Sequence, residues 1–172
     1  LESSRNQLVY QANHDFLTDL ENRFALDKFL NELVQQKAKQ SHVACLLDID
    51  NFNLVNDSFG HEAGNFVLKQ VAKNILPNIS SNDRAYRLSA DEFLVIFDKL
   101  QLEAAYNAID KIINIVQDTV FDWSQMNINV HASAGMAVIS SDTQGASEVL
   151  SELASARTIA KEKGGNRIHV FD

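Results

Sequence analysis

The sequence predicts an α+β fold in which helices flank a central, mainly antiparallel sheet. Four segments repeat apolar residues every three or four positions, the spacing that gives a helix one apolar face. A short unbroken apolar run at 43–47 is typical of a strand buried on both faces. Two further apolar runs, 84–88 and 93–97, are separated by only four residues, which predicts a β-hairpin.

The elements of the first half follow from these patterns. Residues 1–14 carry few apolar side chains, and we expect them to form the end of an incoming helix. A helix is predicted over 22–39, and the strand at 43–47 ends in the acidic segment Asp48-Ile49-Asp50. The next helix is predicted over 63–75, where the proline that follows shortly after ends it.

The second half continues the alternation of helices and strands. A long amphipathic helix is predicted over 102–120, and alternating apolar and polar residues predict one half-buried strand over 128–136. The last helix is predicted over 149–160, with Gly164-Gly165 as its C-terminal cap. A final strand is expected over 167–171. No internal repeat or second domain is evident.

Composition and charge narrow the functional class. The chain has 15 Lys and Arg against 23 Asp and Glu, a net charge of −8, which argues against a nucleic-acid or anionic-membrane surface. No apolar stretch approaches the roughly 20 residues needed to span a bilayer. The single cysteine, Cys45, fits a reducing compartment, so we expect a cytoplasmic domain. Because position 1 is not methionine, we expect a segment of a longer protein, which leaves room for a membrane anchor elsewhere.

Three acids are predicted to meet at one end of the sheet. Asp48 ends one strand, and Asp91 and Glu92 lie in the connection of the hairpin. Clustered carboxylates repel one another unless a cation lies between them, and magnesium prefers such oxygen ligands. The segment 51–56, predicted as a loop, offers backbone N–H groups to phosphate oxygens, which makes a metal-bound triphosphate the expected ligand. The alternative from the residues alone is a group of solvated loop acids.

The sequence resembles the GGDEF family of diguanylate cyclase domains. Four ordered motifs carry this resemblance: Asp15–Arg23, Asp48–Phe52, Asn56–Gly64 and Arg87–Phe93. It implies a fold like the nucleotidyl cyclase core, with a ferredoxin-like palm, over 15–172, and leaves 1–14 as the end of an incoming signalling helix. It also implies that two such domains, each holding one magnesium-bound GTP, condense the nucleotides into cyclic di-GMP.

The resemblance also implies roles for individual residues. Asp48 and Asp91, with the carbonyl of Ile49, match the metal ligands of the family, and Glu92 matches the second acid of the signature. Asp48, Asp91 and Glu92 are therefore the expected catalytic acids, here vestigial. The expected nucleotide-binding positions are Phe52, Asn53, Asn56, Asn65, Ser89, Ala90 and Lys161; among them, Asn56 matches the contact to the guanine edge and Lys161 the phosphate-binding lysine.

The sequence departs from the family at several of these positions. Ser89 and Ala90 replace the two glycines of the signature, where the added atoms intrude on the nucleotide. If the turn needs a positive φ, each non-glycine residue costs about 1 kcal/mol. Asn53 and Gly165 replace a lysine and an arginine, so two cationic contacts to the triphosphate are missing, and Asn65 replaces an aspartate that accepts from guanine.

Ser80 stands where an arginine begins the family's inhibitory product-binding motif, which leaves Asp83 without that partner. We therefore expect no product inhibition at this position.

These departures favour a degenerate domain with little or no cyclase activity, which serves as a regulatory or dimerising module and retains at most weak binding of GTP and Mg²⁺. One alternative is an active cyclase that tolerates a variant signature, and another is a structural spacer without a ligand. By analogy with the family, we expect a homodimer, an N-terminal sensor domain and a C-terminal phosphodiesterase domain of the EAL type.

Overall fold

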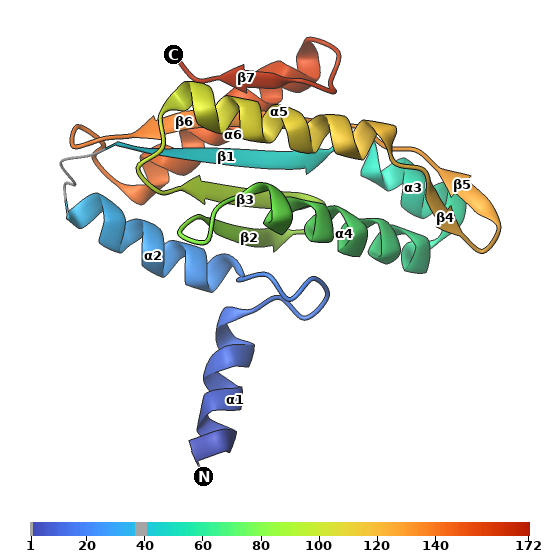
Figure 1. The fold of residues 1–172 in the computed structure, drawn as a ribbon, viewed down its shortest axis with the longest axis horizontal. Coiled ribbons are helices and arrows are strands. Elements are labelled where there is room, and N and C mark those ends of the chain that lie inside the picture. The colour runs from blue at the N-terminus through green and yellow to red at the C-terminus, as the bar shows by residue number, and fades with distance from the viewer. Residues whose placement is uncertain (1, 37–40) are drawn as a thin grey trace.

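The computed structural model describes residues 2–36 and 41–172, and its centre is a five-stranded sheet (Figure 1). The spatial order of the strands is β2-β3-β1-β6-β7, and every neighbouring pair is antiparallel except β6 and β7. The expected α+β fold with a mainly antiparallel sheet is thus confirmed. The strands are β1 (His42–Ile49), β2 (Arg84–Ser89), β3 (Glu92–Phe97), β6 (Ala132–Ile139) and β7 (Ile168–Val170).

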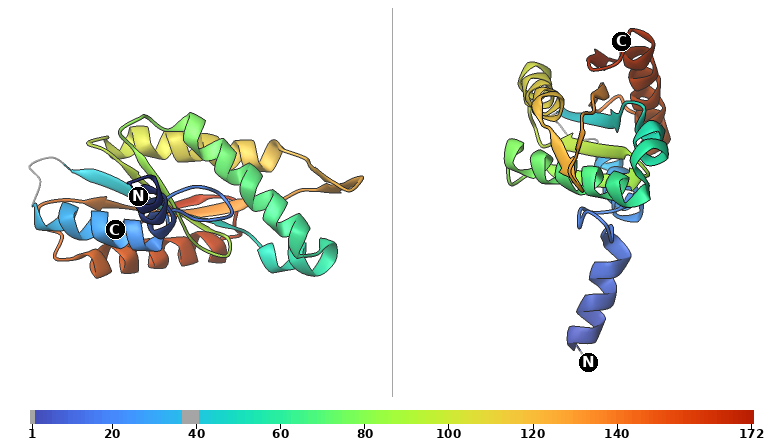
Figure 2. Two further views of the ribbon diagram at one scale, coloured as in Figure 1. Left: turned by 90° about the horizontal axis from the view of Figure 1, so that it is seen from below. Right: turned by 90° about the vertical axis from the view of Figure 1, so that its right-hand side faces the viewer.

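Helices cover both faces of the sheet. The helices are α1 (Glu2–Asn13), α2 (Arg23–Gln35), α3 (Phe52–Phe59), α4 (His61–Ile75), α5 (Leu102–Asp118) and α6 (Ala146–Glu162), with a 3₁₀ turn at Leu76–Asn78. The left view of Figure 2 separates α4 and α5 on one face from α2 and α6 on the other. Helix α1 extends away from this body and buries none of its residues.

Strand β1 is buried along its whole length, as its unbroken apolar run predicts. Because side chains alternate across a strand, Cys45 and Leu47 pack into the layer of α4 and α5, whereas Ala44 and Leu46 pack into the layer of α2 and α6. The next residue on the second side is Asp48, which therefore faces α6 at the end of the strand.

Most predicted elements are present with shifted ends. Asn22 caps α2 by accepting a hydrogen bond of 3.1 Å from the N–H of Ala25. The predicted continuation of this helix over 37–39 lies outside the described residues. The hairpin of β2 and β3 is confirmed. The glycine cap of α6 is also confirmed, since the N–H groups of Gly164 and Gly165 donate to the carbonyls of Lys161 and Ala160.

Three predictions are wrong. The segment 51–56, expected as a loop, is largely helix α3, which follows Asn51 at a positive φ of 55°. The strand expected over 128–136 is divided between two elements: β5 (Met126–Ile128), which pairs with β4 (Phe121–Trp123) in a separate hairpin, and β6, which begins only at Ala132.

Strand β6 is also buried on both faces rather than half-buried. The small residues in its alternation face helix α6 instead of solvent. A Cβ atom on Gly135 would lie 2.4 Å from both the backbone N of Arg157 and the carbonyl of Leu153. Glycine at this position therefore permits α6 to lie very close to the centre of the sheet.

Candidate functional site

The acidic ends of β1 and of the hairpin lie side by side, as the sequence predicts. In the antiparallel register Asp48 stands opposite Glu92, and the N–H of Ile49 donates to the carbonyl of Asp91 at 3.3 Å. Asp48 and Glu92 both lie on the side of the sheet that α6 covers, because Leu46 and Leu94, two residues along their strands, pack in that layer.

Asp48 is a buried acid in contact with two basic side chains. Its side chain is 9% exposed, and its Oδ2 atom lies 3.0 Å from Lys161 Nζ and 3.4 Å from Arg157 Nη1. Its Oδ1 atom is buried and has no hydrogen-bond partner among the described residues. Burial and the neighbouring carboxyl of Asp91 raise the pKa of Asp48 to about 7, and Lys161 opposes this shift.

Each carboxylate oxygen of Glu92 has a side-chain partner. Ser89 Oγ donates to Oε1 of Glu92 at 2.8 Å, and Arg157 forms an ion pair with Oε2. The sequence analysis missed Arg157, although its spacing of four residues from Lys161 places the two cations on one helix face. Together they bring two positive charges to the acidic end of the sheet.

A surface pocket of about 400 Å³ opens beside these acids. Five residues predicted for the site line it together with Asn51 and Leu54: Ile49, Phe52, Asn53, Asp91 and Lys161. Of these lining residues, Phe52 is buried and Asn53 is exposed. Lys161 also lines an adjoining pocket of about 180 Å³ with Asp50 and His131.

Asn56 and Asn65, the two residues expected near the guanine edge, lie on α3 and α4. Asn56 on α3 packs over Gly64 on α4, since a Cβ atom on Gly64 would lie 1.9 Å from Oδ1 of Asn56. Asn65 follows Gly64 and is exposed. Neither asparagine lines the pocket of about 400 Å³.

The turn of the hairpin has one residue in the left-handed region. Ala90 has a φ of 36°, whereas Ser89, the other residue expected to replace a glycine, has no positive φ. The guanidinium of Arg87 donates to the carbonyl of Ala90 at 2.8 Å and to both carboxylate oxygens of Asp15 at 3.1 Å. The turn is therefore tied to the segment that follows α1.

The surroundings of Gly165 leave no room for a larger side chain. It has a φ of 73°, and a Cβ atom there would lie 2.8 Å from Oδ2 of Asp50. That carboxylate accepts hydrogen bonds from Ser133 Oγ at 2.7 Å and from the N–H of Asn166 at 2.9 Å. Any larger side chain at position 165 would displace this arrangement.

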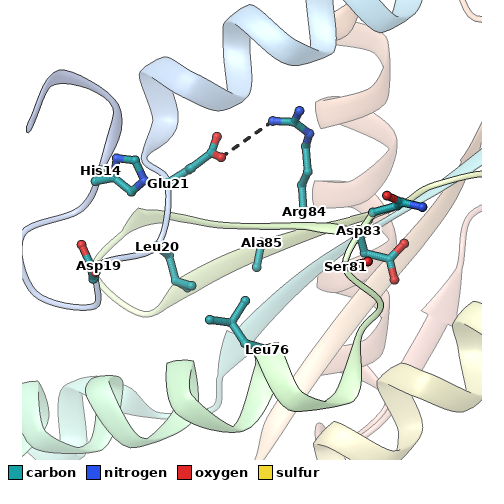
Figure 3. A pocket seen from close by; sticks show the side chains of 10 residues that line it. His14, Asp19, Leu20, Glu21, Leu76, Ser81, Asp83, Arg84 and Ala85 are labelled. Carbon is teal, nitrogen blue, oxygen red and sulfur yellow. Dashed lines mark ion pairs between the residues drawn. The ribbon is translucent and has the colours of Figure 1, made fainter. Parts of the chain in front are cut away.

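A separate pocket, of about 460 Å³, lies between the segment after α1 and the start of β2 (Figure 3). Glu21 and Arg84 form an ion pair of 3.7 Å across it. Asp83 lacks the arginine expected from the family, but it accepts from the N–H groups of Ser80 at 2.8 Å and Asp98 at 2.9 Å. Its carboxylate therefore fixes the loop before β2.

Sequence comparison assigns the family. The model of the diguanylate cyclase GGDEF domain matches residues 12–167. The chain belongs to the GGDEF domain family. This GGDEF domain places its Ser89-Ala90-Asp91-Glu92-Phe93 signature in the hairpin between β2 and β3, and the functional setting of the family is cyclic di-GMP signalling.

Relatives and solved structures agree with this assignment. The domain is 36% identical over 168 residues to the probable diguanylate cyclase DgcE of Escherichia coli, covering 96% of this chain and 15% of that protein. It is 36% identical over 172 residues to the cyclic di-GMP phosphodiesterase PdeB of Shewanella oneidensis, covering 99% of this chain and 20% of that protein. The chain therefore spans a fifth or less of these two relatives.

The fold matches the crystal structure of the coiled coil and GGDEF domain of DgcB from Caulobacter crescentus in complex with c-di-GMP. The TM-score is 0.92 at 24% sequence identity, over 98% of this chain and 91% of that chain. Within the described part of the GGDEF domain, no helix is both long and apolar enough to cross a bilayer. Nor do the described residues group three His, Cys, Asp or Glu side chains into a metal site.

Proposed function

We propose that this GGDEF domain is a regulatory or dimerising module of cyclic di-GMP signalling, with little or no cyclase activity and weak binding of magnesium GTP. One observation carries this proposal. Among the described residues that line the pocket of about 400 Å³, Lys161 is the only cation, and its ammonium group already contacts Asp48 at 3.0 Å. A triphosphate needs several positive contacts, and this pocket offers one that is already paired.

The donor set fits a magnesium ion. The buried Oδ1 of Asp48 has no hydrogen-bond partner in the described part of the chain, and Asp91 lies beside this carboxylate. Both acids offer oxygen ligands of the kind that magnesium takes. Asp48, Asp91 and the carbonyl of Ile49 would hold the ion, with phosphate oxygens and water completing its shell. When bound, magnesium neutralises the triphosphate and polarises its α-phosphorus. Lys161 would contact the phosphates, and Asn56 would contact the guanine edge.

The partners follow from the relatives. The chain covers only 15%, 25% and 20% of the length of three relatives. One of them is the bifunctional diguanylate cyclase/cyclic di-GMP phosphodiesterase MucR of Pseudomonas aeruginosa, at 29% identity. The bifunctional relative supports a C-terminal EAL-type phosphodiesterase domain, and an N-terminal sensor domain is proposed by analogy with the family. The domain itself is proposed to be cytoplasmic and to form a homodimer. The net charge of −8 supports the absence of nucleic-acid and membrane contacts.

The second candidate is an active diguanylate cyclase. It is favoured by the register that places Asp48 opposite Glu92, because all three acids remain at the end of the sheet. A cyclase assay separates the two candidates. The domain, dimerised through a fused coiled coil and supplied with Mg²⁺ and GTP, is expected to form no cyclic di-GMP, and robust product formation would overturn our proposal.

Calorimetry separates the regulatory module from a structural spacer. Titration of GTP with Mg²⁺ into the domain is expected to give weak heat that disappears in the Asp48→Ala variant. Asp27→Ala, which removes an exposed carboxylate on α2, is the matched control and should retain the heat. Absence of heat at millimolar nucleotide would instead support a spacer without a ligand.

A further inference from the structure

Arg157 reaches the acidic end of the sheet from a fixed position on α6. Gly135 lets the backbone of α6 lie against β6 at Arg157 itself, since any Cβ atom there would meet its backbone N. Lys161 follows one helical turn later on the same face. The side chain of Arg157 is 19% exposed and that of Lys161 is 36% exposed, so the arginine is the more enclosed of the two cations.

The arginine bridges acids from two different strands. Its Nη1 atom lies 3.4 Å from Oδ2 of Asp48 on β1 and forms an ion pair with Oε2 of Glu92 on β3. The same Oδ2 atom of Asp48 also lies 3.0 Å from Nζ of Lys161. One oxygen of Asp48 is thus shared by two cationic side chains, whereas its buried Oδ1 atom has no hydrogen-bond partner within residues 2–36 and 41–172.

This arrangement disfavours, without preventing, the binding of a divalent ion at Asp48. Magnesium must bind carboxylate oxygens directly, at about 2.0–2.1 Å. A divalent ion at Asp48 would lie within a few ångströms of the guanidinium of Arg157, where two like charges repel strongly because the site is largely shielded from water. The arginine brings positive charge to the same carboxylate of Asp48 that a divalent ion would bind.

We propose that Arg157 is an internal counter-cation that competes with a divalent metal for Asp48 and so weakens the binding of a metal at this site. This inference rests on the proposed function in that it places the metal site at Asp48 and Asp91. It adds the residue that sets how weakly a metal binds there. A purely structural ion pair between α6 and the sheet would leave metal affinity unaffected by its removal.

Titration with Mn²⁺ tests this proposal directly. Free Mn²⁺ is followed by electron paramagnetic resonance, without nucleotide, in the wild-type chain and in Arg157→Met, which keeps a long side chain but removes the charge. The variant is expected to bind one Mn²⁺ at least tenfold more tightly than the wild type. Arg157→Gln is the second neutral variant, and Arg157→Lys, which restores the charge, should return the affinity to within about threefold of the wild type.

Two further variants locate the effect. Arg23→Met removes an arginine whose ion pair with Asp27 lies on the exposed surface of α2, and it should leave the affinity for Mn²⁺ unchanged. Adding Asp48→Asn to Arg157→Met should abolish the gain. Equal Mn²⁺ affinities in the wild type and both neutral variants, or a gain that survives Asp48→Asn, would overturn the proposal.

The test is independent of the cyclase assay. Cyclic di-GMP formed by the wild-type domain would contradict the proposed function but leave the difference in Mn²⁺ affinity standing. A silent cyclase assay with no difference in Mn²⁺ affinity would overturn the role of Arg157 alone.

Discussion

Ala90 carries backbone strain at the residue scale. Its φ of 36° lies in a region that costs an L-residue about 1 kcal/mol or more and costs glycine little. We therefore expect Ala90→Gly to raise the free energy of unfolding by about 1 kcal/mol, measured by urea denaturation.

The neighbouring serine provides the control. Ser89 has no positive φ, and its hydroxyl donates to Glu92, so Ser89→Gly should lower the free energy of unfolding by about 1 kcal/mol. Equal effects of the two substitutions would show that the conformation of the turn is not what distinguishes them.

Asp48 gives the stability of the domain a dependence on pH. Burial and Asp91 raise its pKa to about 7 in the folded chain, above its ordinary value of 3.8. The folded state therefore holds this proton more tightly than the unfolded state, and the resulting stabilisation, complete below about pH 4, is lost as the pH rises through about 7.

The Asp48→Asn variant isolates this contribution. Relative to the variant, the wild type should lose stability as the pH rises from 4 to about 7. Little further change is expected between pH 7 and 8. Urea denaturation of both proteins at each pH measures the difference. A difference that stays constant over this range would contradict the raised pKa.

At the scale of elements, the ion pair of Asp15 and Arg87 ties the segment after α1 to the hairpin. The carboxylate of Asp15 is 20% exposed. Burial opposes its ionisation, but hydrogen bonds from Thr18 and Arg87 outweigh burial and lower the pKa of Asp15. Asp15→Asn should lower the free energy of unfolding by about 1–2 kcal/mol and speed amide hydrogen exchange in 87–92.

Asp27→Asn is the matched control for this prediction. Asp27 forms an exposed ion pair with Arg23 within α2, so its loss should change stability by less than about 0.5 kcal/mol. Faster exchange over 87–92 in this control as well would argue against a specific link through Asp15.

The elements also show why parts of the fold were predictable and others were not. Strand β1 and the long helices bury many large apolar residues in regular spacing, which the sequence displays directly. Helix α3 has only eight residues, rich in Asn, Asp and Ser, and reads as a loop. Strand β6 places Ser133 and Gly135 against α6, and such small residues cannot be told from a solvated face by pattern alone.

The candidate site was likewise predictable in one part, the acids, and not in another, the contact of Arg157. Acids at the ends of β1 and of the hairpin follow from the positions of the strands, so their convergence could be predicted. The contact of Arg157 depends on how closely α6 approaches the sheet, which is a tertiary property. From the sequence alone, Arg157 looks like any solvated helix residue.

At the scale of the whole molecule, helix α1 differs from the body formed by the sheet and the helices on its two faces, because the body has a buried core and α1 contributes nothing to it. The body packs helices on both faces of one sheet, whereas α1 stands apart with no buried residue (Figure 2). The segment after α1 is anchored through Asn22, whose N–H donates to the carbonyl of Asn13 at 2.9 Å. The domain thus presents an exposed helix at one end and its acidic residues at the end of the sheet.

Gly135 makes the electrostatics of the acidic end depend on a residue without charge. An alanine in its place would force the backbone of α6 away from β6, and Arg157 and Lys161 would move back with it. The size of the residue at position 135 therefore sets how closely the two cations approach the carboxylates. Protein engineers can use this position to change the neutralisation of the acids without replacing any ionisable residue.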